Sequence, residues 1–470
     1  MPVVTATFAV VALVWGAIVA RRSSLLVGCG LSLVVAYALG HEFWNLHAGP
    51  LPITLDRLLL AAIVVLFVVE WRLGKISLRQ LTGADCVLIV LLGIVTLSAL
   101  LSGQPDIADG VTSKWGRLLA SFLLPTVLYI IVRQLAITER DWSRVLVALV
   151  CLGVYLAVTG VCEVAGVWSL VFPRYIADPE LGIHFGRARG PELNSVSLGL
   201  YITACCVCAA ALYPQAKQRW QQLALICALP VMTFGLLLTY TRSTWIGFAV
   251  SGLIVAAFYI PPRLRVPAVV CGALGGLLLV AVSWSHLIGL EREGTAEEAH
   301  HSVDQRASFA YVSWQMFRDH PIFGVGFGRF YDEKLPYLSD RRQKVELDSI
   351  RSLHHHNTLL SFLTETGMIG LAAFVALLVA WGRTAWQLAT SAAAPPWVRM
   401  HGVVLLALLV NYLSSAVFHD LTLLPSQELL LFLFAGVAVN VRQCMLAAAV
   451  APGALEGAAY RTGTSRLSIA

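Results

Sequence analysis

Apolar runs of about 20 residues recur along most of the chain, and this repetition constrains the fold more than any other feature. Such a run has the length that an α-helix needs to cross the roughly 30 Å hydrocarbon core of a bilayer. Of the 470 residues, 58% are hydrophobic and only 13% are charged, which is too little charge for the surface of a soluble protein of this size. The sequence therefore predicts an all-α, polytopic membrane helix bundle.

The candidate spans suggest about 12–13 transmembrane helices. The opening residues have no basic region and no small-residue cleavage site, so we interpret them as a first span rather than a removed signal peptide. We divide the chain into a transmembrane part over 1–285, a large loop over 286–356, three further spans within 357–441 and a flexible tail over 442–470. The candidate spans are 3–20, 24–40, 54–71, 86–103, 118–137, 145–166, 194–213, 222–240, 243–260, 266–285, 357–382, 400–418 and 427–441.

The distribution of lysine and arginine predicts the orientation of these spans. One set of alternating connections, with the tail, holds 17 basic residues, whereas the other short connections hold 7. Because basic connections tend to stay in the cytoplasm, the first set should be cytoplasmic. The segments 167–193, 241–242 and 286–356 should then all lie on the outer face.

The ten cysteines predict packing rather than chemistry. Nearly all lie inside apolar runs, and in the "CCVC" stretch at 205–208 three cysteines on one helix would point to different faces. The outer loops contain no cysteine, so we expect no disulfide there.

Several arginines stand out on the predicted outer face. Arg242 lies alone between two apolar runs, where a half-buried guanidinium is costly unless an anion meets it. Arg187 and Arg189 lie one residue apart in an outer loop, an arrangement that suits a phosphate or a carboxylate. Contact with lipid headgroups explains Arg187 equally well. Asn194, further along this loop, should cap the span that follows.

The large outer loop contains a predicted amphipathic helix over 305–319, because apolar residues recur there at helical spacing. Asp304 should cap this helix, and Pro321 should follow its end. Arg306 would then lie in the first turn, where its guanidinium and unpaired backbone N–H groups can meet an anion together. The "GVGFG" stretch after the helix predicts a turn that needs glycine.

Three consecutive histidines, His354, His355 and His356, precede the apolar run from 357. Their side chains cannot all reach one zinc ion and no carboxylate pattern completes a site, so we expect no metal. A histidine at the outer edge of a span can accept a proton from a hydroxyl group. Spacing alone leaves this role and that of an interfacial histidine without a task equally open.

The stretch "HHHNTLLSFLTETGMIGL" resembles the signature of the O-antigen ligase and Wzy-type polymerase family. In that family a His–Asn pair opens a span and a Glu-x-Gly-x-x-Gly pattern follows, which correspond here to His356, Asn357, Glu365, Gly367 and Gly370. The stretches "LPITLDRLLL", "FRDHPIFGVGFGRF", "TYTRSTWIGF" and "RARGPELNSVSLGLYI" are also similar to family segments. The last has Asn-Ser-Val at 194–196, where the family has Asn-Pro-Asn.

The resemblance implies a metal-independent, inverting, GT-C-like glycosyltransferase in the bacterial inner membrane, with its site facing the periplasm among membrane lipids. It would move a glycan from undecaprenyl pyrophosphate to a hydroxyl of a glycan, lipid A core or protein acceptor, without a cofactor and without nucleic acid. Ligase and polymerase remain equally open. A lipid-linked glycan flippase is the alternative from another class, although its spans should carry charges near their middle.

The roles of individual residues follow from this resemblance. His356 would be the general base, and Arg242 and Arg306 would clamp the pyrophosphate. Arg189 would add a third contact to this clamp, and further substrate contacts are expected from Arg187, His355 and Asn357.

Glu365 is expected to have a structural task instead. It lies nine residues after His356, about half a turn around a helix and roughly 13 Å along it. We therefore expect it to meet a polar partner on another span. Gly367 and Gly370 should allow close approach between helices.

Overall fold

The helices found in the structure agree with the predicted spans. The computed structural model describes residues 24–46, 53–103, 113–260, 296–340 and 346–450, and a few isolated positions between 263 and 270. Each predicted span within these ranges coincides with a helix or, for 118–137 and 357–382, with two consecutive helical segments; the predicted spans 3–20 and 266–285 lie outside the described residues, apart from those isolated positions. Among the described helices, 9 are long and apolar enough to cross a membrane. The chain is therefore an all-α polytopic membrane bundle, as predicted.

The bundle is built from consecutive helices joined by short connections. A two-residue antiparallel hairpin, β1 (Asn45–Leu46) with β2 (Ile53–Thr54), is the sheet found in the described part. The helices are α2 (Leu25–Leu39), α3 (Leu55–Arg72), α4 (Gly83–Leu101), α5 (Lys114–Leu118), α6 (Leu124–Gln134), α7 (Glu139–Val164), α8 (Ser195–Leu212), α9 (Arg219–Leu237), α10 (Arg242–Tyr259), α13 (Ala296–Asp319), α14 (Phe330–Glu333), α15 (Thr358–Glu365), α16 (Gly367–Thr390), α17 (Pro396–Ala416) and α18 (Pro425–Val450). A π-helical turn, η1 (Leu119–Leu123), joins α5 to α6, and short 3₁₀ turns are η2 (Trp168–Leu170), η3 (Arg174–Ala177), η4 (Tyr213–Gln215), η5 (Leu335–Ser339), η6 (Leu347–Ile350) and η7 (Leu421–Leu423).

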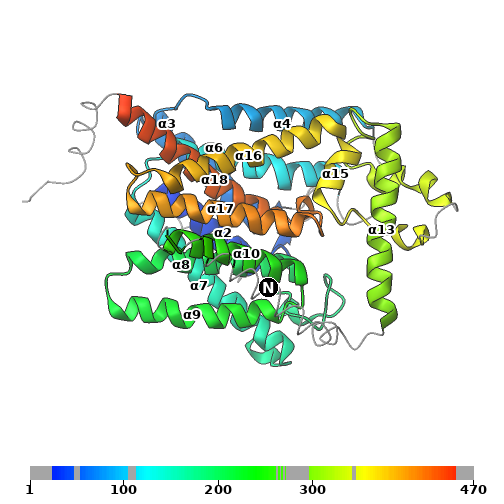
Figure 1. The fold of residues 1–470 in the computed structure, drawn as a ribbon, viewed down its shortest axis with the longest axis horizontal. Helices are drawn as coiled ribbons and strands as arrows, with labels where there is room; N and C mark the ends of the chain where they lie inside the picture. Colours follow the sequence, from blue (N-terminus) through cyan, green and yellow to red (C-terminus); the bar gives the residue numbers. More distant parts are fainter. Residues whose placement is uncertain are drawn as a thin grey trace, which may run out of the picture.

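Most helices run side by side along one direction, whereas α13 lies across one end of the bundle (Figure 1). Helix α8 is apolar around its whole circumference and almost completely buried, as expected of a helix in the centre of a bundle. Its first turn is capped by Asn194, whose side chain accepts hydrogen bonds from the backbone N–H groups of Val196 and Ser197, as predicted. The cysteines at 205, 206 and 208 are buried on this helix, which confirms their packing role.

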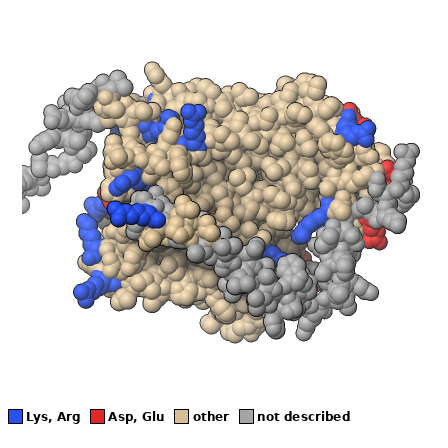
Figure 2. Space-filling model, in the orientation of Figure 1, with Lys and Arg blue, Asp and Glu red and all other residues tan. Residues whose placement is uncertain are grey.

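The two ends of the bundle differ in charge. Figure 2 shows Lys and Arg side chains gathered at the end where α9 and α17 begin, and fewer at the end covered by α13. The connections that precede α4, α7, α9 and α17 meet at the first end, and these belong to the set predicted to be cytoplasmic. Which end faces the cytoplasm stays a prediction.

The span predicted over 357–382 is broken between α15 and α16. Gly367 has φ +68°, and a Cβ atom there would overlap the carbonyl oxygen of Ile322 in the loop after α13. Gly370 lies over the side chain of Thr366, at the start of its own helix. The prediction that these glycines bring two helices together is therefore wrong, because Gly367 forms the break and seats a loop. The "GVGFG" glycines do form turns, since Gly324, Gly326 and Gly328 all have positive φ.

Helix α13 is longer than its apolar pattern indicates. It begins at Ala296, so the prediction that Asp304 caps it is wrong, and Arg306 lies more than two turns inside the helix rather than in its first turn. The predicted apolar face is correct: Phe309, Val312 and Met316 are buried. The helix ends at Asp319, just before Pro321, as predicted. Helix α18 likewise continues to Val450, past the start of the tail predicted at 442.

Candidate active site

The three residues predicted to be catalytic come from three separate elements and meet at the end of the bundle covered by α13 (Figure 1). Arg242 is the first residue of α10, Arg306 projects from α13, and His356 precedes α15. All three side chains are exposed. Partial loss of hydration, together with the charge of Arg242, lowers the pKa of Arg306. The two guanidinium groups therefore lie within electrostatic reach of each other.

The imidazole of His356 lies in the same cluster. Loss of hydration, followed by the nearby charge of Arg306, lowers its pKa below the usual 6.5, and the carboxylate of Asp420 opposes this shift. Its ring centroid is 5.1 Å from that of Phe309 on α13. His356 is therefore neutral near pH 7, which is the protonation state that a general base requires.

The other two histidines of the triplet face inward. The ring of His355 is buried, stacks on Phe330 with ring centroids 3.5 Å apart, and pairs through Nε2 with the Thr364 hydroxyl at 2.7 Å. His354 lies against Tyr331, with ring centroids 5.0 Å apart. The ring of His355 is enclosed by protein, an arrangement that does not favour its predicted substrate contact. The triplet thus contains two anchors and one exposed imidazole.

Asn357 uses both ends of its amide within the protein. Its oxygen accepts a hydrogen bond from the backbone N–H of Leu360 and so caps α15, and its Nδ2 donates to the Val417 carbonyl at 2.8 Å. These bonds fix the direction in which α15 leaves the histidine segment. The geometry therefore gives Asn357 a positioning task, and its predicted substrate contact stays a prediction.

The two arginines of the outer loop have different surroundings. Arg189 is buried, and its guanidinium donates to the carbonyl oxygens of Ile176, Asp178 and Leu181. This geometry does not favour the predicted substrate contact of Arg189, because its donors hold the loop together. Arg187 is partly exposed and donates to the carbonyl of Tyr240 at 3.4 Å, two residues before Arg242. Arg187 therefore lies beside the cluster, whereas the sequence suggests Arg189 as the third contact of the clamp.

Two residues that line this cluster were not predicted from the sequence. His419, between α17 and η7, is close enough to His356, Arg306 and His184 for each to lower its pKa, although burial is the larger cause. Phe418 places its ring 5.5 Å from the guanidinium carbon of Arg306. Both lie in the stretch "FHD" after a span. This stretch has no repeat and no motif spacing, so the sequence alone does not mark either residue as part of a site.

The backbone is strained around the same cluster. His184 and Tyr240 have φ +64° and +48°, values that residues other than glycine rarely adopt. The His184 ring is held by the Ser195 hydroxyl, 2.7 Å from Nδ1. Strained residues of this kind often mark functional sites, since their surroundings must hold them in place.

A buried ionic network around Arg117 holds Asp420, which directly follows His419 of the cluster, on the inner side of the site. Arg117 donates to Glu365 at 2.8 Å, to Asp420 at 3.3 Å and to the hydroxyls of Ser361 and Thr422 at 2.9 and 2.7 Å. The prediction that Glu365 has a polar partner on another span is therefore confirmed. The π-helical turn η1 follows Arg117 directly, and π-helical turns are often found at functional sites.

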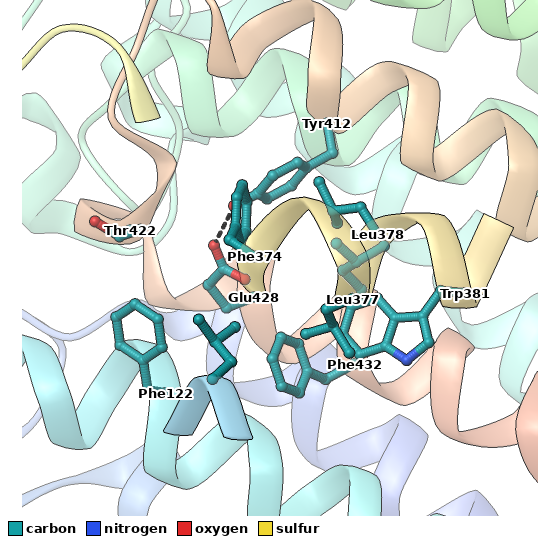
Figure 3. A pocket seen from close by; sticks show the side chains of 11 residues that line it. Phe122, Phe374, Leu377, Leu378, Trp381, Tyr412, Thr422, Glu428 and Phe432 are labelled. Carbon is teal, nitrogen blue, oxygen red and sulfur yellow. Dashed lines mark hydrogen bonds between the residues drawn. The ribbon is translucent and has the colours of Figure 1, made fainter. Parts of the chain in front are cut away.

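A small cavity lies next to this network and apart from the cationic cluster. It is lined mainly by aromatic and leucine side chains of α16, α17 and α18, and the Tyr412 hydroxyl donates to Glu428 at 2.6 Å across its wall (Figure 3). Its free volume holds on the order of one water molecule. Within the described residues no group of His, Cys, Asp and Glu side chains could hold a metal ion.

Comparison with protein families identifies the region that carries this site. Residues 223–375 match the family described as O-antigen ligase. The matched region includes Arg242, Arg306 and His356 and ends within α16. Comparison with curated proteins gives no match. The match supports the resemblance seen in the histidine motif, and the chain is a polytopic membrane protein in which residues 223–375 are similar to the O-antigen ligase family.

Proposed function

We propose that this protein is a membrane glycosyltransferase that moves a glycan from undecaprenyl pyrophosphate to an acceptor hydroxyl at the periplasmic face of the bacterial inner membrane. The observation that carries this proposal is the convergence of Arg242, Arg306 and His356 from three elements at one end of the bundle. Two guanidinium groups beside a neutral imidazole match the needs of this reaction, namely an anion site next to a base.

The reaction follows from this arrangement. The acceptor oxygen attacks the anomeric carbon, and His356 takes the hydroxyl proton. The bond between the anomeric carbon and the phosphate oxygen breaks, and undecaprenyl pyrophosphate leaves with the bonding electrons. Arg242 and Arg306 neutralise the negative charge that develops on this leaving group, and Arg187 lies where it can add a third cation. Attack opposite the leaving group inverts the anomeric carbon, and no step requires a metal.

The positions of charged residues favour an enzyme over a flippase. Along the described spans, Arg117 and Glu428 lie in the first turns of their helices and Arg133 and Glu163 in the last, while Arg383 and Arg442 lie about two turns before the ends of α16 and α18. A transporter that carries a charged headgroup through the membrane would need polar groups or broken helices near the middle of its spans. Among the described residues, the cationic cluster lies instead at one end, where a lipid headgroup can reach it without crossing.

Deletion of the gene in its host, followed by analysis of surface and lipid-linked glycans, tests the proposal. A polymerase predicts that single lipid-linked repeat units accumulate, and a ligase predicts that long lipid-linked chains accumulate. Either product should disappear on complementation with the intact protein and persist with His356→Ala. Unchanged lipid-linked and surface glycans in the deletion strain would contradict the proposal, and so would restoration by His356→Ala.

A further inference from the structure

We propose that His419 is a positioning residue of the active site, which holds the first turn of α10, with Arg242, against the segment that carries His356. This inference rests on the proposed function and deepens it. It begins from the imidazole of His419, whose Nε2 lies 3.1 Å from the Ser243 hydroxyl. Ser243 is buried and directly follows Arg242 in the first turn of α10. A bond at this point restrains the turn that carries the guanidinium.

The backbone of His419 forms a second connection, to the base. Its carbonyl oxygen accepts a hydrogen bond from the Thr358 hydroxyl at 2.9 Å, and that hydroxyl in turn accepts one from the backbone N–H of Leu421. Thr358 is the first residue of α15 and lies two residues after His356. Asn357 adds a bond from the same segment to Val417. One short stretch, 417–421, therefore connects α10 with the histidine segment.

The third predicted catalytic group contacts the same stretch. The ring of Phe418 lies beneath the guanidinium of Arg306, at 5.5 Å. The stretch is itself immobilised on its inner side, because Asp420 is bound by Arg117. Phe418 thus contacts Arg306, and His419 contacts the turn that carries Arg242. Asp420 binds Arg117 of the buried network. This arrangement explains how groups from distant parts of the chain keep one geometry.

The charge of the cluster explains why an imidazole suits this position. His419 is surrounded by His356, Arg306 and His184, so a permanent cation here would add repulsion to a site that already holds arginines. A neutral imidazole provides hydrogen bonding without adding charge. The alternative is that His419 only fills space between α10 and α17, as His401 does between α17 and α18, where its Nε2 pairs with the Phe434 carbonyl at 3.1 Å.

Binding of undecaprenyl pyrophosphate to the full-length protein in nanodiscs separates these interpretations. We expect His419→Ala to weaken binding about tenfold, the change expected when one intramolecular hydrogen bond is lost. Ser243→Ala should weaken binding similarly, and the double variant should be no worse than either single variant, because both changes remove the same bond. His419→Gln retains a hydrogen-bonding group near the position of Nε2 and should recover most of the affinity.

Two control variants make the outcome specific. His401→Gln should leave binding unchanged, and thermal unfolding of every variant shows whether it is folded. Normal binding by folded His419→Ala, or additive losses in the double variant, would overturn the inference. His356→Ala separates this inference from the proposed function: it should bind undecaprenyl pyrophosphate normally but lack transfer in the complemented deletion strain. Loss of transfer with His356→Ala but normal binding with His419→Ala would refute only the role of His419, whereas intact transfer with His356→Ala would refute the proposed function.

Discussion

Arg117 and Arg306 show how differently one residue type is used in two regions of this molecule. Arg117 is buried, and its donors are taken up by two carboxylates and two hydroxyls. Arg306 is exposed, and its charge lies beside Arg242 and His356. The first region balances its charge internally and holds the fold together. The second brings two guanidinium groups together at the surface, and such a concentration of positive charge favours binding of a diphosphate.

Replacement of the proposed general base, His356, should have the largest effect on transfer by the exposed region. His356→Ala removes the group that takes the acceptor proton, so transfer should fall by about 10²–10⁴-fold, the contribution usual for a general base. Binding of the lipid-linked donor should remain, because the arginines are intact. Transfer is measured as glycan product formed by the complemented deletion strain and by the purified protein. His354→Ala and His355→Ala are poor controls, since both rings are packed in the loop.

Replacement of the exposed arginine should have the next largest effect. Arg306→Gln removes one donor from the proposed clamp, and transfer should fall by about 10²–10³-fold without loss of folded protein. Arg318→Gln is the matched control, because Arg318 is also exposed on α13 and pairs with Gln315 on the same helix. Equal transfer activity of the two variants would mean that Arg306 contributes no more to the reaction than an ordinary surface arginine, which would contradict the proposed clamp.

Disruption of the buried Arg117 network should lower the free energy of unfolding. Arg117→Gln leaves Glu365 and Asp420 without their cation, and breaking a buried pair in this way typically costs about 3–5 kcal/mol of unfolding free energy. Arg144→Gln breaks an exposed pair with Asp141 at 3.1 Å, for which about 0–1 kcal/mol is typical. Thermal unfolding in nanodiscs compares the two variants. Similar unfolding temperatures would mean that the Arg117 network contributes little to the fold.

The sequence predicts the helices well because membrane spans depend on local composition, and the histidine motif predicts His356 because its neighbours are distinctive. Prediction from sequence is weakest where a role depends on distant contacts. Arg189 and His355 have the right chemistry for a substrate site, but their surroundings enclose them. The start of α13 was missed because its first residues are polar and give no apolar period. His419 was missed because its importance comes from Ser243 and Thr358, far away in the chain.

The pH dependence of transfer should show the smallest effect, but it tests most specifically whether Arg306 and His356 are neighbours in the exposed region. His356 must be neutral to accept a proton, and loss of hydration and the nearby Arg306 lower its pKa below 6.5, so the midpoint of the acid limb of kcat/KM should lie below pH 6.5. Arg306 is one cause of this low pKa. In Arg306→Gln the pKa of His356 should therefore rise, and the acid limb of the residual activity should move to higher pH, whereas Arg318→Gln should leave the limb in place. A limb that does not move in Arg306→Gln would mean that the two groups are not neighbours in the working protein, and the proposed clamp beside the base would have to be given up.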